Sequence, residues 1–167
     1  MNFKRAFLVL FLISSLGGYA QNSLEKLLAR HNSHSIPYIS VQELKMLHKG
    51  NNVAILDARE REEFEVSHIK GAVFVSYSNF SAEEVSHMFK DKNTPIVVYC
   101  SLGIRSENIS EKLKKSGFTN VRNLYGGIFE WKNNGYSVVE MQGRETEKVH
   151  AFSPSWGKWL KKGEKVY

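Results

Sequence analysis

The chain contains one cysteine, Cys100, and the residues that follow it suit a reactive thiol. A short loop runs from this cysteine to an arginine through Ser101, Leu102, Gly103, Ile104 and Arg105. We expect a helix to leave from the end of this loop, and the first turn of a helix has unpaired N–H groups and a partial positive charge. Those groups and the Arg105 cation would stabilise a thiolate or bind an anion, while Leu102 and Ile104 offer no polar side chain. The pattern predicts a cysteine nucleophile inside an anion-binding loop.

Two elements must hold this loop in place. Ile96–Tyr99 is predicted to be a buried strand, because four apolar β-formers in a row follow Pro95. The helix after the loop is expected to face the sheet with Ile109 and Leu113 and to end at Gly117. Its solvent side is expected to carry Glu107, Glu111, Lys112, Lys114 and Lys115.

The cysteine loop, followed by Ser106 and a helix, resembles the active-site loop of the rhodanese family, which includes the thiosulfate sulfurtransferases. Two further stretches resemble signatures of the same family, in the same order along the chain. The upstream one comprises Leu56 to Glu60 (LDARE), Glu63-Phe64 and Ser67 to Ala72 (SHIKGA), and the downstream one runs from Val121 to Trp131 (VRNLYGGIFEW). Together the three signatures extend over roughly Ile39 to Val139.

The resemblance implies a sulfurtransferase that needs neither a cofactor nor a metal. The Cys100 thiolate would take a sulfane sulfur from a small anionic donor, thiosulfate or a persulfide or polysulfide. The resulting persulfide would pass its sulfur to a thiol or another nucleophilic acceptor. Residues 101–105 would bind the donor or the persulfide. Many rhodaneses have a further basic residue in this loop, and here positions 101, 102 and 104 are Ser, Leu and Ile, so the donor stays open.

Cysteine loops also serve in other classes of protein. A rhodanese-like sulfur carrier or protein-binding module with little turnover would keep the same cysteine. A cysteine-dependent phosphatase or arsenate reductase has five residues between cysteine and arginine, whereas four intervene here. A cysteine protease would need a positioned histidine, and nothing in the sequence links a histidine to Cys100.

Asp57, Arg59 and His68 are further polar candidates. Asp57 and Arg59 lie just after a predicted strand, where open α/β sheets build their sites. They are expected either to form a structural ion pair or to lie at the rim of the Cys100 pocket. His68 is interpreted as a hydrogen-bonded turn residue rather than a catalytic base.

Helices and strands alternate along the chain, which predicts a three-layer α/β domain with a central parallel sheet and helices on both faces. The expected helices are Ser23–Arg30, Val41–Lys49 with Ser40 as its cap, Glu60–Val66, a segment from Ser81 to Phe89, and Ile128–Lys132, with Phe129 and Trp131 in the core. Val41, Leu44, Met46 and Leu47 are expected to form the apolar side of the helix Val41–Lys49. The expected strands are Val53–Leu56, Ala72–Val75, Ile96–Tyr99, Val121–Leu124 and Tyr136–Val139.

Composition and charge narrow the class of protein. The 167 residues, 42% of them apolar, are enough for one domain with a substantial core. Residues 1–20 combine Lys4 and Arg5 with an apolar run and small residues near Ala20, which predicts a cleaved signal peptide. The protein is therefore expected to be exported, periplasmic or secreted, without stable membrane insertion after cleavage. The formal charge of +6 falls to +4 without those two basic residues, and no nucleic-acid partner is predicted.

The predicted domain organisation is a signal peptide (1–20), a helical lead-in (21–38), a rhodanese-like domain (39–140) and an aromatic and basic C-terminal extension (141–167). Phe152, Trp156 and Trp159 in the extension approach helical spacing. They are expected to pack on the domain, with docking of a protein partner as the alternative.

Overall fold

The computed structural model describes residues 23–167. The chain divides into two units, residues 1–33 and residues 34–167. Within the first unit, residues 23–31 form a helix, which confirms the helix predicted over Ser23–Arg30. The predicted signal peptide lies outside the described residues. No helix in the described part of the chain is long and apolar enough to cross a membrane.

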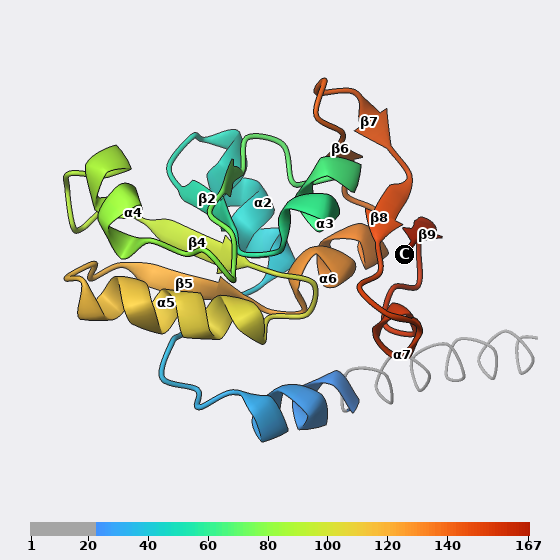
Figure 1. Ribbon diagram of the computed structural model, residues 1–167, viewed down its shortest axis with the longest axis horizontal. Helices are drawn as coiled ribbons and strands as arrows, with labels where there is room; N and C mark the ends of the chain where they lie inside the picture. The colour runs from blue at the N-terminus through green and yellow to red at the C-terminus, as the bar shows by residue number, and fades with distance from the viewer. Residues whose placement is uncertain (1–22) are drawn as a thin grey trace, which may run out of the picture. The chain divides into compact units, whose positions relative to one another are not determined.

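A parallel sheet of five strands forms the centre of the second unit (Figure 1). Its strands are β1 (Tyr38–Ile39), β2 (Ala54–Asp57), β3 (Val73–Phe74), β4 (Ile96–Tyr99) and β5 (Val121–Leu124). They lie in the order β1-β5-β4-β2-β3, which places β4 in the middle. All four residues of β4 are buried, as expected of a strand that is covered on both faces.

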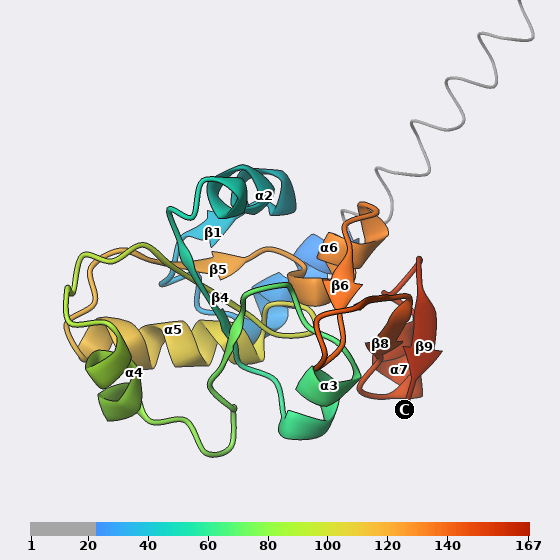
Figure 2. The same ribbon diagram turned by 90° about the horizontal axis from the view of Figure 1, so that it is seen from above.

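Helices cover both faces of this sheet, which confirms the predicted three-layer α/β fold. They are α2 (Val41–Lys49), α3 (Arg61–Val66), α4 (Ala82–Met88), α5 (Arg105–Lys115) and α6 (Gly127–Asn133). On one face, Val85 of α4 and Ile109 and Leu113 of α5 share a core cluster with residues of β2 and β4. Helix α2 lies on the opposite face (Figure 2) and contacts α6, where Lys45 Nζ is 5.4 Å from the Trp131 ring centroid.

Most predicted elements are confirmed, since β4, β5 and α2 have the predicted bounds and the others differ at their ends by one or two residues. Strand β1 was missed, because two residues are too few to show a pattern. The sheet therefore begins at Tyr38, inside the predicted lead-in.

Two predicted exposures are wrong. Glu107, placed on the solvent side of α5, is 1% exposed, and its carboxylate accepts a hydrogen bond from the His34 N–H at 2.8 Å. Met46, placed on the apolar side of α2, is 68% exposed. In both cases the burial of the side chain depends on which elements pack against the helix, and the helical pattern does not contain that information.

The chain after β6 (Val138–Val139) forms a small structure of its own. Strand β7 (Glu145–Thr146) pairs antiparallel with β6, and β8 (Lys148–His150) pairs in parallel with β9 (Glu164–Val166). The aromatic spacing gives only a short helix, α7 (Pro154–Gly157). Strand β8 lies beside α3, the helix that reaches the Cys100 loop.

Side chains of α6 tie this C-terminal structure to the domain. Lys132 Nζ is 2.8 Å from a carboxylate oxygen of Glu147. Asn133 donates a hydrogen bond to the Trp159 carbonyl at 2.9 Å and accepts one from the Lys161 N–H at 2.6 Å. These contacts hold the C-terminal structure against α6.

Candidate active site

Cys100 is the first residue after the central strand β4, at the carboxyl end of the sheet. The first two carbonyl groups of the loop accept hydrogen bonds from the start of α6. The N–H of Ile128 donates to the Cys100 carbonyl at 2.9 Å, and the N–H of Phe129 donates to the Ser101 carbonyl at 3.2 Å. Because these carbonyls are hydrogen-bonded to α6, N–H groups of the loop can point toward its interior.

The interior of the loop holds the cysteine sulfur. The Gly103 N–H donates to Cys100 Sγ at 3.1 Å, and Ser106 Oγ lies 3.5 Å from the same sulfur. Gly103 has a φ of +103°, a conformation that favours glycine, and its carbonyl accepts from Asn123 Nδ2 at 2.8 Å. Asn123 also accepts from the Ser106 hydroxyl at 2.7 Å, so one β5 side chain fixes both residues that face the sulfur.

These contacts change the acidity of the thiol. Burial by itself would raise the pKa of Cys100, which is 0% exposed. The Arg105 cation, the Ser106 hydroxyl and the N–H groups of Ser106 and Gly103 outweigh burial, so the pKa lies below its usual value. The site thus favours a thiolate, although the sulfur is closed to solvent.

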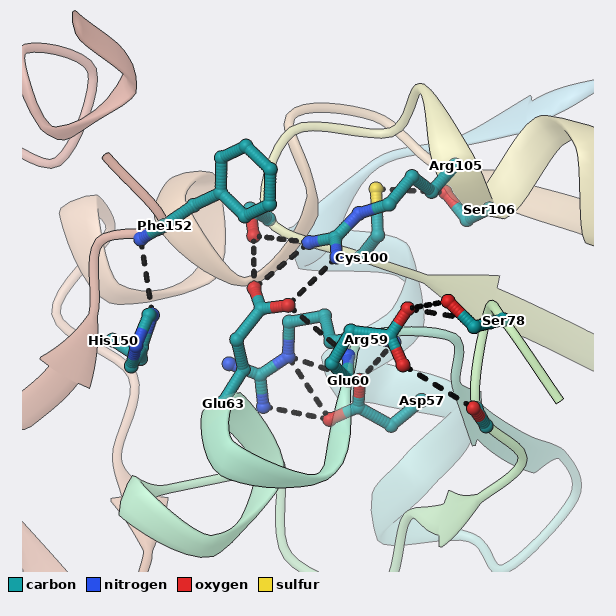
Figure 3. A network of polar contacts seen from close by, with 12 residues as sticks. Asp57, Arg59, Glu60, Glu63, Ser78, Cys100, Arg105, Ser106, His150 and Phe152 are labelled. Carbon is teal, nitrogen blue, oxygen red and sulfur yellow. Dashed lines mark hydrogen bonds and ion pairs between the residues drawn. The ribbon is translucent and has the colours of Figure 1, made fainter. Parts of the chain in front are cut away.

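Arg105, the last loop residue, is held by a carboxylate from α3. Its Nη1 and Nη2 atoms donate to the two oxygens of Glu63 at 2.7 and 2.8 Å (Figure 3). Ser101 Oγ donates to the same carboxylate at 2.9 Å and accepts from Arg105 Nη2 at 3.0 Å. The arginine that was predicted to bind an anion is therefore already bound to one inside the protein.

The Glu63 carboxylate remains ionised in this setting. Burial would raise the pKa of Glu63, but its hydrogen bonds and charge attraction to Arg105, with a smaller effect of Arg59, lower it. Glu63 was missed as a site residue, although it lies in a matched signature. A glutamate on a short helix is usually exposed, and no sequence pattern shows that its partner lies 42 positions away.

Asp57 and Arg59 form the structural ion pair that was expected as one alternative, and their place at the rim of the Cys100 pocket stays a prediction. Both residues are 0% exposed, and Arg59 Nη2 is 2.7 Å from Asp57 Oδ2. Arg59 Nη2 also donates to the Ser67 carbonyl at 2.6 Å, and Asp57 accepts from the Tyr99 hydroxyl. This pair joins the ends of β2 and β4 to the turn that follows α3.

The other predicted residues have structural positions. Leu102 is buried and Ile104 is half-buried. His68 is hydrogen-bonded as predicted, with Nδ1 3.1 Å from the Phe64 carbonyl, but its backbone forms an isolated bridge with Val139 rather than a turn. Ser106 and Asn123 were not predicted to belong to the site, because their role depends on contact between α5 and β5.

Comparison with known proteins agrees with the resemblance seen in the sequence. A family model described as a rhodanese-like domain matches residues 40–134. Among curated proteins, the chain is 37% identical over 109 residues to a tRNA uridine(34) hydroxylase of Listeria welshimeri, covering 62% of this chain and 34% of that protein. The chain spans about a third of the length of the first curated relatives it matches.

Solved structures agree with the fold. A thiosulfate sulfurtransferase from Pseudomonas aeruginosa superposes with a TM-score of 0.61 at 23% identity, over 84% of this chain and 26% of that one. The rhodanese-like domain of an Anabaena protein gives a TM-score of 0.56 at 24% identity, over 63% of this chain and 80% of that one.

Proposed function

Because this chain belongs to the family of rhodanese-like domains, we propose that it is a sulfurtransferase that carries sulfane sulfur as a persulfide on Cys100. The observation that carries the proposal is the Gly103 N–H, which points at Sγ from 3.1 Å in a loop that lowers the pKa of the thiol. Because the loop itself lowers the pKa of the thiol, the proposed reaction needs no histidine base.

The proposed reaction has two displacement steps. The Cys100 thiolate attacks the outer sulfur of the donor, the S–S bond of the donor breaks, and sulfite leaves with the bonding electrons if the donor is thiosulfate. With a persulfide donor, a thiolate leaves instead. An acceptor then attacks the terminal sulfur of the Cys100 persulfide, and the Cys100 thiolate is the leaving group.

In both steps the Cys100 loop stabilises negative charge on sulfur. The N–H groups of Gly103 and Ser106 donate to Sγ, and in the proposed reaction they also stabilise charge on a sulfur added to Sγ. Arg105 supports that charge from the side while it remains paired with Glu63. We therefore expect the loop to bind the sulfur donor through its backbone N–H groups rather than through an unpaired cation.

The experiment offers the purified protein thiosulfate or a small persulfide, with cyanide as acceptor. We expect Cys100 to gain one sulfur, about 32 Da by intact mass, and thiocyanate to form. Cys100→Ser should lose both products and keep the same circular dichroism spectrum. Absence of both products from the unaltered protein with every donor would rule the proposal out.

A non-turnover sulfur carrier is the second candidate, because the closed position of Cys100 would also protect a stored persulfide. It predicts the mass adduct without thiocyanate. The tRNA hydroxylation named for the relatives is a weaker candidate, since the similarity covers about a third of those proteins. The predicted signal peptide would also separate this chain from tRNA.

A further inference from the structure

Phe152 brings an aromatic ring from the C-terminal extension to the Cys100 site. The Cζ atom of Arg105 lies 4.7 Å from the centroid of this ring, within the range of a cation–π contact. In Figure 3 the Arg105 guanidinium lies between the Phe152 ring and the Cys100 sulfur. Phe152 lies beyond residues 40–134, the part of the chain that the family model matches.

The backbone of Phe152 is held in a conformation that aromatic residues rarely adopt. Its φ is +64°, and the Ser153 N–H donates to the Ala151 carbonyl at 2.7 Å across it, which makes a γ-turn. The Phe152 N–H donates to His150 Nδ1 at 3.1 Å, and the ring packs against Trp156 at 4.8 Å between centroids. Such strain persists only where the surroundings impose it, and it is concentrated at functional sites.

The ring completes the enclosure of Arg105. Glu63 and Ser101 occupy both terminal nitrogens of the guanidinium, and Phe152 packs on its face. Arg105 is 8% exposed as a result, while Phe152 itself is 44% exposed. The Phe152 ring is therefore the more exposed member of this contact and lies between solvent and the Arg105 guanidinium.

We propose that Phe152 is a specificity-determining residue, which admits small sulfur donors and acceptors to Cys100 and excludes bulky ones. The sulfur-transfer part of this inference rests on the proposed function. A cyanide or a short-chain thiol would pass beside the ring, whereas a thiol of tripeptide size would collide with it.

The test compares the unaltered protein with Phe152→Gly, Phe152→Tyr and Met141→Ala. Glycine adopts a positive φ without strain, so Phe152→Gly removes the ring and preserves the turn. Phe152→Tyr keeps an aromatic ring at this position. Met141 is an apolar side chain of the same extension, 53% exposed, and serves as the matched control.

The first measurement is alkylation of Cys100, the only cysteine of the chain, by iodoacetamide and by a bulky fluorescein maleimide. We expect Phe152→Gly to raise the ratio of the maleimide rate to the iodoacetamide rate roughly tenfold, the size of a modest steric discrimination. Phe152→Tyr and Met141→Ala should keep the original ratio. An unchanged ratio in Phe152→Gly, or an equal rise in both rates, would overturn the proposal.

The second measurement is sulfur transfer from the Cys100 persulfide to cyanide and to glutathione. Phe152→Gly should raise kcat/KM for glutathione relative to cyanide by roughly tenfold. Equal ratios in the two proteins would overturn the role in acceptor choice. If the alkylation ratio changes but neither protein takes up sulfur, the steric role of Phe152 stands and the proposed function fails.

Discussion

Glu63 and Arg105 form an ion pair that is almost completely removed from water beside the Cys100 loop, with side chains 3% and 10% exposed. Two parallel hydrogen bonds and the Ser101 hydroxyl compensate much of the cost of burying these charges. Removal of one charge leaves the other buried without a partner, which is more costly than the loss of an exposed pair. The network therefore fixes the position of the loop as well as its charge.

We expect Glu63→Gln to destabilise the protein by about 3–5 kcal/mol, because the Arg105 charge loses its counter-ion. Glu65→Gln on the same helix is the control. Glu65 is 50% exposed and lies 3.7 Å from Arg61, so its loss should cost about 1 kcal/mol or less. Urea unfolding of the two variants measures the difference, and equal costs would contradict a structural role for the buried pair.

The same pair makes stability depend on pH. The folded state lowers the pKa of Glu63, so its stabilisation is complete above the unfolded value of about 4.3. It is lost as the pH falls through the lower folded value. Urea midpoints measured across the acid range should therefore fall less steeply for Glu63→Gln than for the unaltered protein, and parallel curves would exclude this contribution.

At the scale of elements, the loop is shaped by the close approach of α6. Gly127 has a φ of +56°, and a Cβ atom there would lie 2.2 Å from the Cys100 carbonyl oxygen. Two N–H groups of the same helix hold the loop carbonyls. The Gly-Gly pair of the downstream signature thus permits the contact that turns the loop amides toward the sulfur.

Gly127→Ala should destabilise the protein by about 3 kcal/mol or more, from the steric clash and the positive φ together, and should slow sulfur uptake by Cys100. Gly117→Ala is the matched control, since Gly117 also has a positive φ, +94°, but open space at the Cβ position. It should cost about 1–2 kcal/mol. Similar costs for both variants in urea unfolding would show that the contact with Cys100 is not tight.

The elements around the site could be predicted from sequence because they depend on local patterns. Strand β4 is four apolar residues in a row, and Ser40 caps α2 by accepting from the Glu43 N–H at 3.2 Å. The interactions within the site could not be predicted in the same way. Glu63, Arg105 and Phe152 meet only because three separate segments pack together, and Glu107 is buried by a segment that carries no signal of its own.

At the scale of the whole molecule, residues 141–167 lie beyond the part of the chain that the family model matches. Strand β8 lies beside α3, which carries Glu63, and the turn after β8 carries Phe152. Val149, Ala151 and Leu160 are buried at 0%, 0% and 1% exposure and anchor this segment. The extension can therefore control access to Cys100 without altering the loop itself.

We propose that the protein is exported, because residues 1–20 have the sequence pattern of a signal peptide. We expect the protein purified from its natural source to begin at Gln21, because the small residues before it suit signal-peptide cleavage. Intact mass spectrometry measures this directly. A mass that includes residues 1–20 would contradict the proposal.

The central claim is that the folded protein lowers the pKa of the Cys100 thiol below that of an ordinary cysteine. Because the chain has one cysteine, the ultraviolet absorbance difference between the protein and Cys100→Ser reports this thiolate alone, without any need for a reagent to reach it. As the pH rises, we expect the absorbance to appear with a midpoint clearly below about 8.5, the value of an ordinary cysteine. A midpoint at or above about 8.5 would contradict the account.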